Sequence, residues 1–177
     1  MVEADYRPTL VVGIRFGGYE VAECMIRAAS EPLPILPITC RRAATNAKAR
    51  IPTLRSMLTA LPRPALDLLR RVEHRLFIAP RTHKARPRVV DNAEIDVIAD
   101  WLANQPSGPR ILVTDDAIDS GATLAAVLRL VRTVCPFGTE IRTAAITQTL
   151  EQPITTPDYV LFHNTLCRFP WSFDAAA

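Results

Sequence analysis

The sequence predicts an α/β fold built on a doubly wound parallel sheet. Two observations carry this prediction: short continuous apolar stretches alternate with segments whose apolar residues recur at helical spacing, and glycine- or proline-containing turns separate them. The first apolar stretch, LVVGI at 10–14, is typical of a strand buried on both faces of a parallel sheet. A chain of 177 residues is long enough to bury one core, so we expect a single domain spanning residues 1–177.

The N-terminal elements form a strand, a turn and a helix. After the strand at 10–14, residues 15–18 (RFGG) form the turn, and residues 19–29 have apolar side chains at helical spacing before Pro32. Residues 35–39 form a second strand. Parallel strands joined through a helix make a right-handed βαβ unit.

Regular alternation resumes after residue 90. Asp91 or Asn92 is expected to cap the next helix, because both side chains accept hydrogen bonds from free amides at a helix start. The expected elements are a helix at 93–103, a strand at 111–114, a helix at 122–134, and strands at 141–147 and 159–162. This order is that of a doubly wound sheet.

The middle of the chain is strongly basic. Residues 41–88 contain 13 basic residues against two acidic ones. Residues 64–77 have the pattern of a basic amphipathic helix, and a shorter helix is expected at 54–61. We interpret residues 41–90 as a basic helical insertion over the sheet edge that meets a polyanion.

Composition excludes several classes of protein. No apolar run approaches the roughly 18 residues that a membrane span requires. The first ten residues lack the features of a secretory signal, so we expect a soluble, cytoplasmic protein that contacts no membrane. The four cysteines, at 24, 40, 135 and 167, show no CxxC pairing, and therefore suggest neither a zinc site nor a redox dithiol.

The densest group of polar residues follows the strand at 111–114. Asp115, Asp116 and Asp119 precede a Ser-Gly-Ala-Thr turn that opens a helix. Backbone amides at a helix start suit a phosphate dianion, and Gly121 allows the unusual dihedral angles of such a turn. Paired carboxylates can accept hydrogen bonds from a vicinal diol. The spacing is that of a site for a sugar phosphate.

The segment ILVTDDAIDSGATL at 111–124 resembles the signature of type I phosphoribosyltransferases, which bind 5-phosphoribosyl-1-pyrophosphate (PRPP). The resemblance implies that fold, with a small C-terminal hood, and it implies Mg²⁺ as cofactor and a homodimer. Asp115 and Asp116 would hold the ribose hydroxyls and reach the Mg²⁺ indirectly, through ribose or water. The residues implied to bind the 5-phosphate are Ala117, Ile118, Asp119, Ser120, Gly121, Ala122 and Thr123.

Asp119 also carries an expectation about catalysis. Relatives that use 6-oxopurines have an aspartate at this position, near the imidazole nitrogen of the purine, whereas orotate and adenine enzymes usually have a small residue. A carboxylate there can take the proton that leaves the attacking nitrogen. The resemblance therefore implies that Asp119 is the catalytic residue and that the acceptor is purine-like.

The turn at 15–18 resembles the pyrophosphate loop of the same family. Relatives commonly have a basic residue directly before the two glycines, but here Phe16 stands there and Arg15 comes one residue earlier. Other members place a basic pyrophosphate ligand at the end of the second strand. The residues implied to bind pyrophosphate are Arg15, Phe16, Gly17, Gly18, Arg41 and Arg42.

The C-terminal segment LFHNTLCRFPWSFD resembles the hood of xanthine, guanine and hypoxanthine enzymes. The base-reading positions differ: Leu166 stands where an aromatic residue would stack on the base, and Gln148 replaces the lysine near the purine 6-oxygen. Together with Cys167, these are the implied base-binding residues. Ser172 replaces an acid after Trp171, and Asp174 is the substitute expected near the metal. We expect Trp171 itself to pack within the hood.

These patterns lead to one main hypothesis and two alternatives. The main hypothesis is a Mg²⁺-dependent phosphoribosyltransferase of nucleotide metabolism, such as purine salvage, that joins PRPP to a small nitrogen heterocycle and releases pyrophosphate. The first alternative is a non-catalytic sensor of PRPP or a nucleotide that binds nucleic acid or a protein through the basic segment. The second keeps catalysis but uses an unusual heterocycle, as Leu166 and Gln148 suggest.

Overall fold

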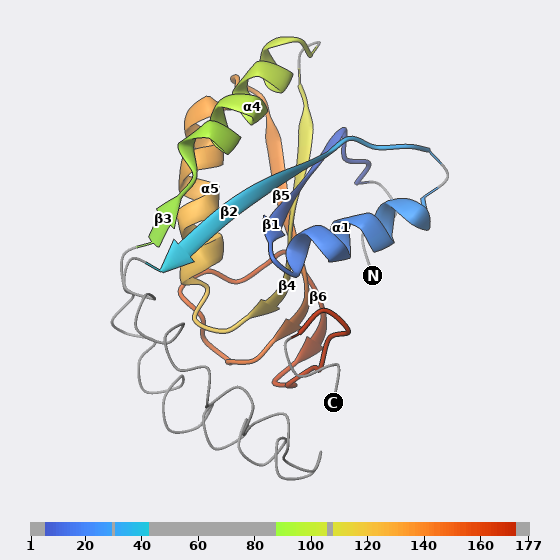
Figure 1. The fold of residues 1–177 in the computed structure, drawn as a ribbon, viewed down its shortest axis with the longest axis vertical. Coiled ribbons are helices and arrows are strands. Elements are labelled where there is room, and N and C mark those ends of the chain that lie inside the picture. The colour runs from blue at the N-terminus through green and yellow to red at the C-terminus, as the bar shows by residue number, and fades with distance from the viewer. Residues whose placement is uncertain (1–5, 30, 43–87, 106–107, 173–177) are drawn as a thin grey trace, which may run out of the picture.

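The computed structural model describes residues 6–29, 31–42, 88–105 and 108–172, which form a sheet with helices on both faces (Figure 1). In chain order the described elements are β1 (Leu10–Arg15), α1 (Gly18–Arg27), β2 (Ile35–Arg42), β3 (Arg88–Val90), α4 (Asn92–Ala103), β4 (Arg110–Ile118), α5 (Ala122–Val134), β5 (Glu140–Gln148) and β6 (Tyr159–His163).

The sheet has six strands in the order β3-β2-β1-β4-β5-β6. All neighbouring pairs are parallel except β2 and β3, which are antiparallel. The predicted doubly wound α/β fold is therefore confirmed. The sequence pattern did not predict β3, because three residues are too few to show a periodicity.

The two faces of the sheet bury different side chains. Helix α1 covers one face, and α4 and α5 cover the other (Figure 1). Side chains alternate along each strand, so Val11 of β1 faces α1 and joins the smaller apolar cluster. Val12 faces the opposite way, into the larger cluster with Ile98 of α4 and Val127 of α5.

The strand order reverses at one point in the sheet, between β1 and β4. The chain passes from β1 outward to β2, and later returns to place β4 on the other side of β1. In such sheets, ligands bind outside the carboxyl ends of the two strands where the order reverses. The crevice is therefore expected where β1 and β4 end.

Most expected boundaries agree with the structure, but β4 differs in an important way. The strand was expected to end at residue 114, with the acidic pair in the following turn, whereas it continues to Ile118. Asp115 and Ala117 lie in the ladder with β5. Asp91 is the cap of α4, since its carboxylate accepts a hydrogen bond from the Ala93 amide at 3.1 Å.

Some predictions fall on residues 43–87, which lie outside the described part of the chain. They are the helices at 54–61 and 64–77 and most of the insertion at 41–90. The single-domain organisation stays a prediction. Within the described ranges, none of the helices is both long and apolar enough to cross a membrane.

Candidate active site at the carboxyl ends of β1 and β4

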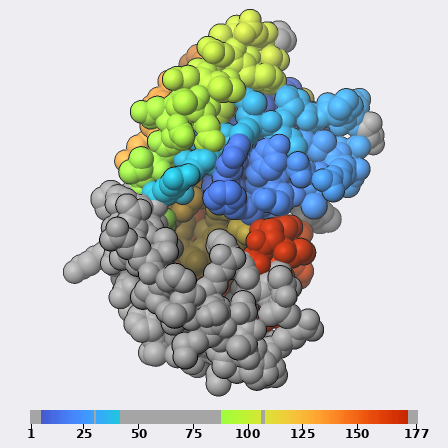
Figure 2. Space-filling view, viewed as in Figure 1, coloured from blue at the N-terminus to red at the C-terminus, as the bar shows by residue number. Residues whose placement is uncertain are grey.

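A cavity of about 240 Å³ lies at the reversal point of the sheet. Figure 2 shows a hollow below the blue N-terminal elements and beside the red C-terminal segment. The lining residues are Ile14, Arg15, Phe16, Cys40, Arg88 and the continuous stretch from Asp115 to Leu124. The structure therefore brings the predicted phosphate turn, the acidic pair and part of the predicted pyrophosphate loop around one space.

The phosphate turn is formed by Asp119, Ser120 and Gly121, between β4 and α5. Gly121 is the N-cap of α5, with a left-handed φ of 73°. The first amides of a helix have no acceptor within the helix and attract anions. One of them is engaged weakly, because the Ala122 amide donates to Ser120 Oγ at 3.4 Å. The turn thus offers backbone donors and a hydroxyl to the cavity.

Gly121 is required by the packing of the protein itself. A Cβ atom at this position would lie 2.5 Å from the Thr155 carbonyl oxygen and 2.7 Å from the Thr155 nitrogen. The Ile154 amide donates to the Ser120 carbonyl at 2.8 Å, and so fixes the same loop against the turn. The loop after β5 therefore supports the phosphate turn.

The acidic pair lies side by side on β4. Asp115 is buried, and its Oδ1 accepts a hydrogen bond from the Asp116 amide at 3.0 Å. Burial, and then the neighbouring charge of Asp116, raises the pKa of Asp115 well above its usual range. Such a pair favours the approach of a cation or of hydroxyl donors.

Asp116 connects three parts of the structure. Its Oδ2 accepts a hydrogen bond from the Trp171 indole Nε1 at 2.9 Å. On another side, the carboxylate packs against Gly17, where a Cβ atom would lie 2.2 Å from Oδ2. Gly17 has a φ of 104°, so a side chain is excluded there by both conformation and space. Asp116 therefore lies between the glycine turn and the hood.

Asp119 has a partner that the sequence pattern did not indicate. Thr149, the residue directly after β5, donates its hydroxyl to Asp119 Oδ1 at 2.5 Å. The Thr149 amide donates to the Ile118 carbonyl at 2.9 Å, which fixes its backbone. Thr149 could have been suspected, because polar residues at the carboxyl ends of neighbouring parallel strands meet at one edge.

The basic residues around the cavity differ in part from those expected. Arg15 lies on the rim, with its Nε 3.7 Å from Glu94 Oε1 at the start of α4. Glu94 also accepts hydrogen bonds from the backbone amide and the hydroxyl of Thr39. Phe16 is exposed beside Arg15, and the peptide bond between them is cis.

Arg88 is a lining residue that the sequence pattern did not single out. It comes from β3, whose pairing with β2 places Arg88 opposite Arg42. Arg41 is exposed and does not line the cavity, and the side chain of Arg42 is not described.

Cys40 also lines the cavity. Burial raises the pKa of its thiol, while the charge of Arg88 lowers this pKa and the charge of Asp115 raises it. Arg88 and Asp115 therefore lie near the same thiol.

The predicted base-binding residues do not line this cavity. Gln148 is buried, and its Nε2 donates to the carbonyls of Leu150 at 2.7 Å and Glu151 at 3.4 Å. Its Oε1 is buried without a hydrogen-bond partner among the described groups. Leu166 is exposed and Cys167 half-buried, whereas Asp174 lies outside the described residues.

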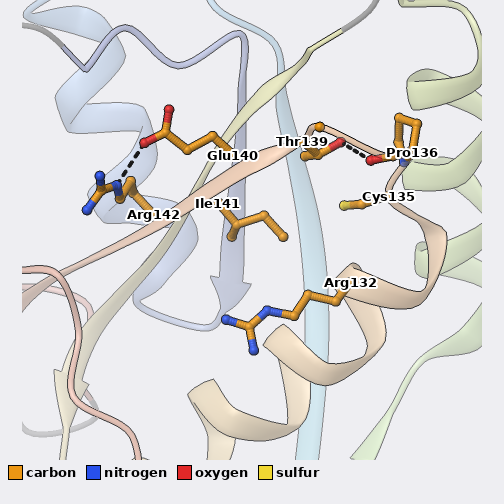
Figure 3. Close-up of a pocket in the computed structure, with 8 residues that line it drawn as sticks. Arg132, Cys135, Pro136, Thr139, Glu140, Ile141 and Arg142 are labelled. Atoms are coloured by element: carbon orange, nitrogen blue, oxygen red, sulfur yellow. Dashed lines mark hydrogen bonds and ion pairs between the residues drawn. The ribbon is translucent and has the colours of Figure 1, made fainter.

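A second cavity, of about 530 Å³, lies at the opposite end of β5 (Figure 3). Arg132 and Arg142 are its lining cations. Arg142 is already paired, with its Nε 2.9 Å from Glu140 Oε1 and its Nη1 3.7 Å from Asp158 Oδ1. Neither the acidic pair, the phosphate turn nor the Arg15-Phe16 segment of the first cavity lines this one.

Comparison with known protein families identifies the family of this chain. The model of the phosphoribosyl transferase domain family matches residues 2–176. The chain belongs to this family. No curated protein sequence shows significant similarity to the chain.

Solved structures with a similar fold include other phosphoribosyltransferases. A purine phosphoribosyltransferase from Pyrococcus horikoshii is 17% identical, with a TM-score of 0.56, covering 95% of this chain and 80% of that one. The xanthine-guanine-hypoxanthine phosphoribosyltransferase of Helicobacter pylori is 15% identical, with a TM-score of 0.54, covering 96% and 78%. These likenesses confirm the phosphoribosyltransferase fold.

Proposed function

We propose that this chain transfers ribose 5-phosphate from PRPP to a nitrogen heterocycle and releases pyrophosphate. The observation that carries the proposal is that one cavity is lined by an acidic pair, by a phosphate turn at a helix start and by Arg15 and Phe16 of the turn at 15–18. Together they offer partners for each part of PRPP.

Each part of the cavity matches one part of the donor. The amides and hydroxyls of residues 117–123 would bind the 5-phosphate, and Asp115 and Asp116 would accept hydrogen bonds from the ribose hydroxyls. The loop at 15–18 would face the pyrophosphate. Arg15 and Arg88, which line the cavity, would supply positive charge on that side, whereas the predicted Arg41 does not line it.

The acidic pair also fits a magnesium ion. The described residues contain no group of three or more acidic, histidine or cysteine side chains that could hold a metal alone. Mg²⁺ needs no such group, because it commonly binds one or two carboxylates together with waters and substrate phosphates. Asp115 and Asp116 would hold it through water or ribose, with Asp174 as the further predicted ligand. Bound there, the ion would supply positive charge to the pyrophosphate.

The proposed reaction is a substitution at the anomeric carbon of the ribose. A ring nitrogen of the acceptor forms the new bond to this carbon as the bond to pyrophosphate breaks, through an oxocarbenium-like transition state. Asp119 takes the proton that leaves the attacking nitrogen, and Thr149 holds the carboxylate in place. The basic side chains stabilise the charge of the leaving group.

The proposed acceptor is purine-like, and Gln148 guides the choice of compounds. Its amide nitrogen is engaged by two backbone carbonyls and its Oε1 is buried, so Oε1 becomes available to an acceptor only if the side chain moves toward the cavity. If Gln148 contacts the acceptor, it favours a ring that donates a hydrogen bond there. The panel should therefore include amino-substituted heterocycles beside hypoxanthine, guanine and xanthine.

The test is pyrophosphate release from PRPP and Mg²⁺ with each member of the panel. We expect release with at least one acceptor and a large loss in Asp119→Asn, which keeps the shape but removes the base. Arg132→Ala, at the second cavity, is the matched control. If PRPP binds but no acceptor supports release, and nucleic acid binds with a steep salt dependence, the regulatory alternative replaces this proposal.

A further inference from the structure

The C-terminal hood reaches the donor side of the cavity through one side chain. Trp171 donates its indole N–H to Asp116 Oδ2 at 2.9 Å, across 55 positions of sequence. Trp171 is partly buried, as is Asp116. Figure 2 shows the red C-terminal segment directly beside the blue N-terminal elements.

Contacts within the hood hold the indole in place. The Trp171 ring stacks on Phe169, with 5.2 Å between ring centroids and 6° between the planes. A tight turn closes around the pair, because the Ser172 amide and hydroxyl both donate to the Phe169 carbonyl, at 3.0 and 2.6 Å. These contacts within the hood therefore position the ring.

The hood is in turn attached to the sheet. Thr147 of β5 donates its hydroxyl to the Thr165 carbonyl at 2.5 Å. The Asn164 amide donates to the Gln148 carbonyl at 2.8 Å. These two bonds fix the start of the hood at the carboxyl end of β5, next to β4.

Asp116 has little freedom between its neighbours. Gly17 packs against one side of the carboxylate and the indole N–H holds Oδ2. An ionised carboxylate has about four acceptor positions, so Oδ1 can still receive a hydroxyl. The geometry selects one orientation of the side chain.

We propose that Trp171 is a positioning residue for PRPP, which orients Asp116 for the ribose hydroxyls. This inference rests on the proposed function, because it assumes that Asp116 binds the donor. It assigns to the hood a role on the donor side, separate from the predicted reading of the base by Leu166 and Cys167.

The contact itself can be tested without any ligand. The chain has two tryptophans, so Trp101→Phe leaves Trp171 as the only one. In this background, Asp116→Ala should change the intensity or emission maximum of Trp171, because the acceptor of the indole N–H is lost. Asp119→Asn is the matched control and should leave the emission unchanged. Identical emission with and without Asp116 would overturn the inference.

The role in binding is tested with Trp171→Phe, which keeps an aromatic ring over Phe169 and removes the N–H donor together with one ring of the indole. We expect the Kd and KM for PRPP to rise about tenfold, the usual effect of losing one hydrogen bond to a charged group, with kcat changed less than about twofold. Trp101→Phe should match the wild type in both constants. Circular dichroism checks that both variants fold.

A double-variant cycle separates positioning from general packing. If Trp171 acts through Asp116, Trp171→Phe should have no further effect on PRPP affinity in an Asp116→Ala background. The same tenfold loss in both backgrounds would contradict the inference. If Trp171→Phe binds PRPP with wild-type affinity, the positioning role of Trp171 is excluded and the proposed function is unaffected. If the wild type does not bind PRPP, the proposed function itself is overturned.

Discussion

The hydrogen bond from Thr149 to Asp119 gives a direct way to test the proposed general base. Thr149→Val keeps the size and branching of the side chain but removes the hydroxyl, which lies 2.5 Å from Asp119 Oδ1. The backbone should keep its position, since the Thr149 amide still donates to the Ile118 carbonyl. The substitution therefore releases the carboxylate without moving the turn.

The size of the effect follows from the type of bond. A hydrogen bond to an ionised group contributes about 1.5–3 kcal/mol. Asp119 is only partly buried, so water replaces part of this contribution. If the bond orients Asp119 in the transition state, its loss should lower kcat by about 10- to 100-fold, since each 1.4 kcal/mol or so is a factor of ten.

The assay is pyrophosphate release at saturating PRPP and acceptor, which reports kcat. Thr149→Ser retains a hydroxyl and is the matched control, with kcat expected within about threefold of the wild type. A kcat for Thr149→Val equal to that of the wild type would refute the reasoning. An equal loss in both variants would show that the effect does not depend on the hydroxyl, because Thr149→Ser retains it.

Three further predictions concern other parts of the cavity. Gly121→Ala should lower the free energy of unfolding by about 2–5 kcal/mol in urea titrations, because a left-handed conformation and a collision with the loop after β5 add up; an unchanged midpoint would contradict this. The folded state raises the pKa of Asp115, so it favours the protonated carboxyl. The contribution of Asp115 to the free energy of unfolding is therefore complete below about pH 4 and is lost as pH rises through the folded-state pKa. In buffer without divalent cations, Asp115→Asn should therefore gain stability relative to the wild type as pH rises, and parallel pH profiles of the two proteins would exclude this. Arg88→Ala should raise the KM for PRPP roughly tenfold, whereas Arg132→Ala should not, and equal KM values in these two variants would remove Arg88 from the donor site.

The main architecture could be predicted from the sequence, because the buried faces of helices and strands give periodic patterns of apolar residues. The helix containing Ile98 and the strand containing Val12 were both visible as apolar patterns. The end of β4 was not, because Asp115 and Asp116 interrupt the apolar run while backbone pairing with β5 continues. The ladder, rather than hydrophobicity, sets the length of that strand.

The candidate site was predictable where its residues are consecutive. The segment at 115–123 indicated the phosphate turn and the acidic pair, and both line the cavity. Thr149 and Trp171 were missed as partners because their contacts join positions 30 and 55 residues apart. Arg88 was one of many basic residues in its segment, and only the pairing of β3 with β2 brings it to the cavity.

The central claim is that this cavity binds PRPP, and calorimetric titration with PRPP and Mg²⁺ tests it most directly. We predict saturable binding with one PRPP per chain, its loss in a variant combining Asp115→Asn and Asp116→Asn, and its retention in Arg132→Ala. Absence of binding to the wild type, or equal binding by the double variant, would contradict the claim.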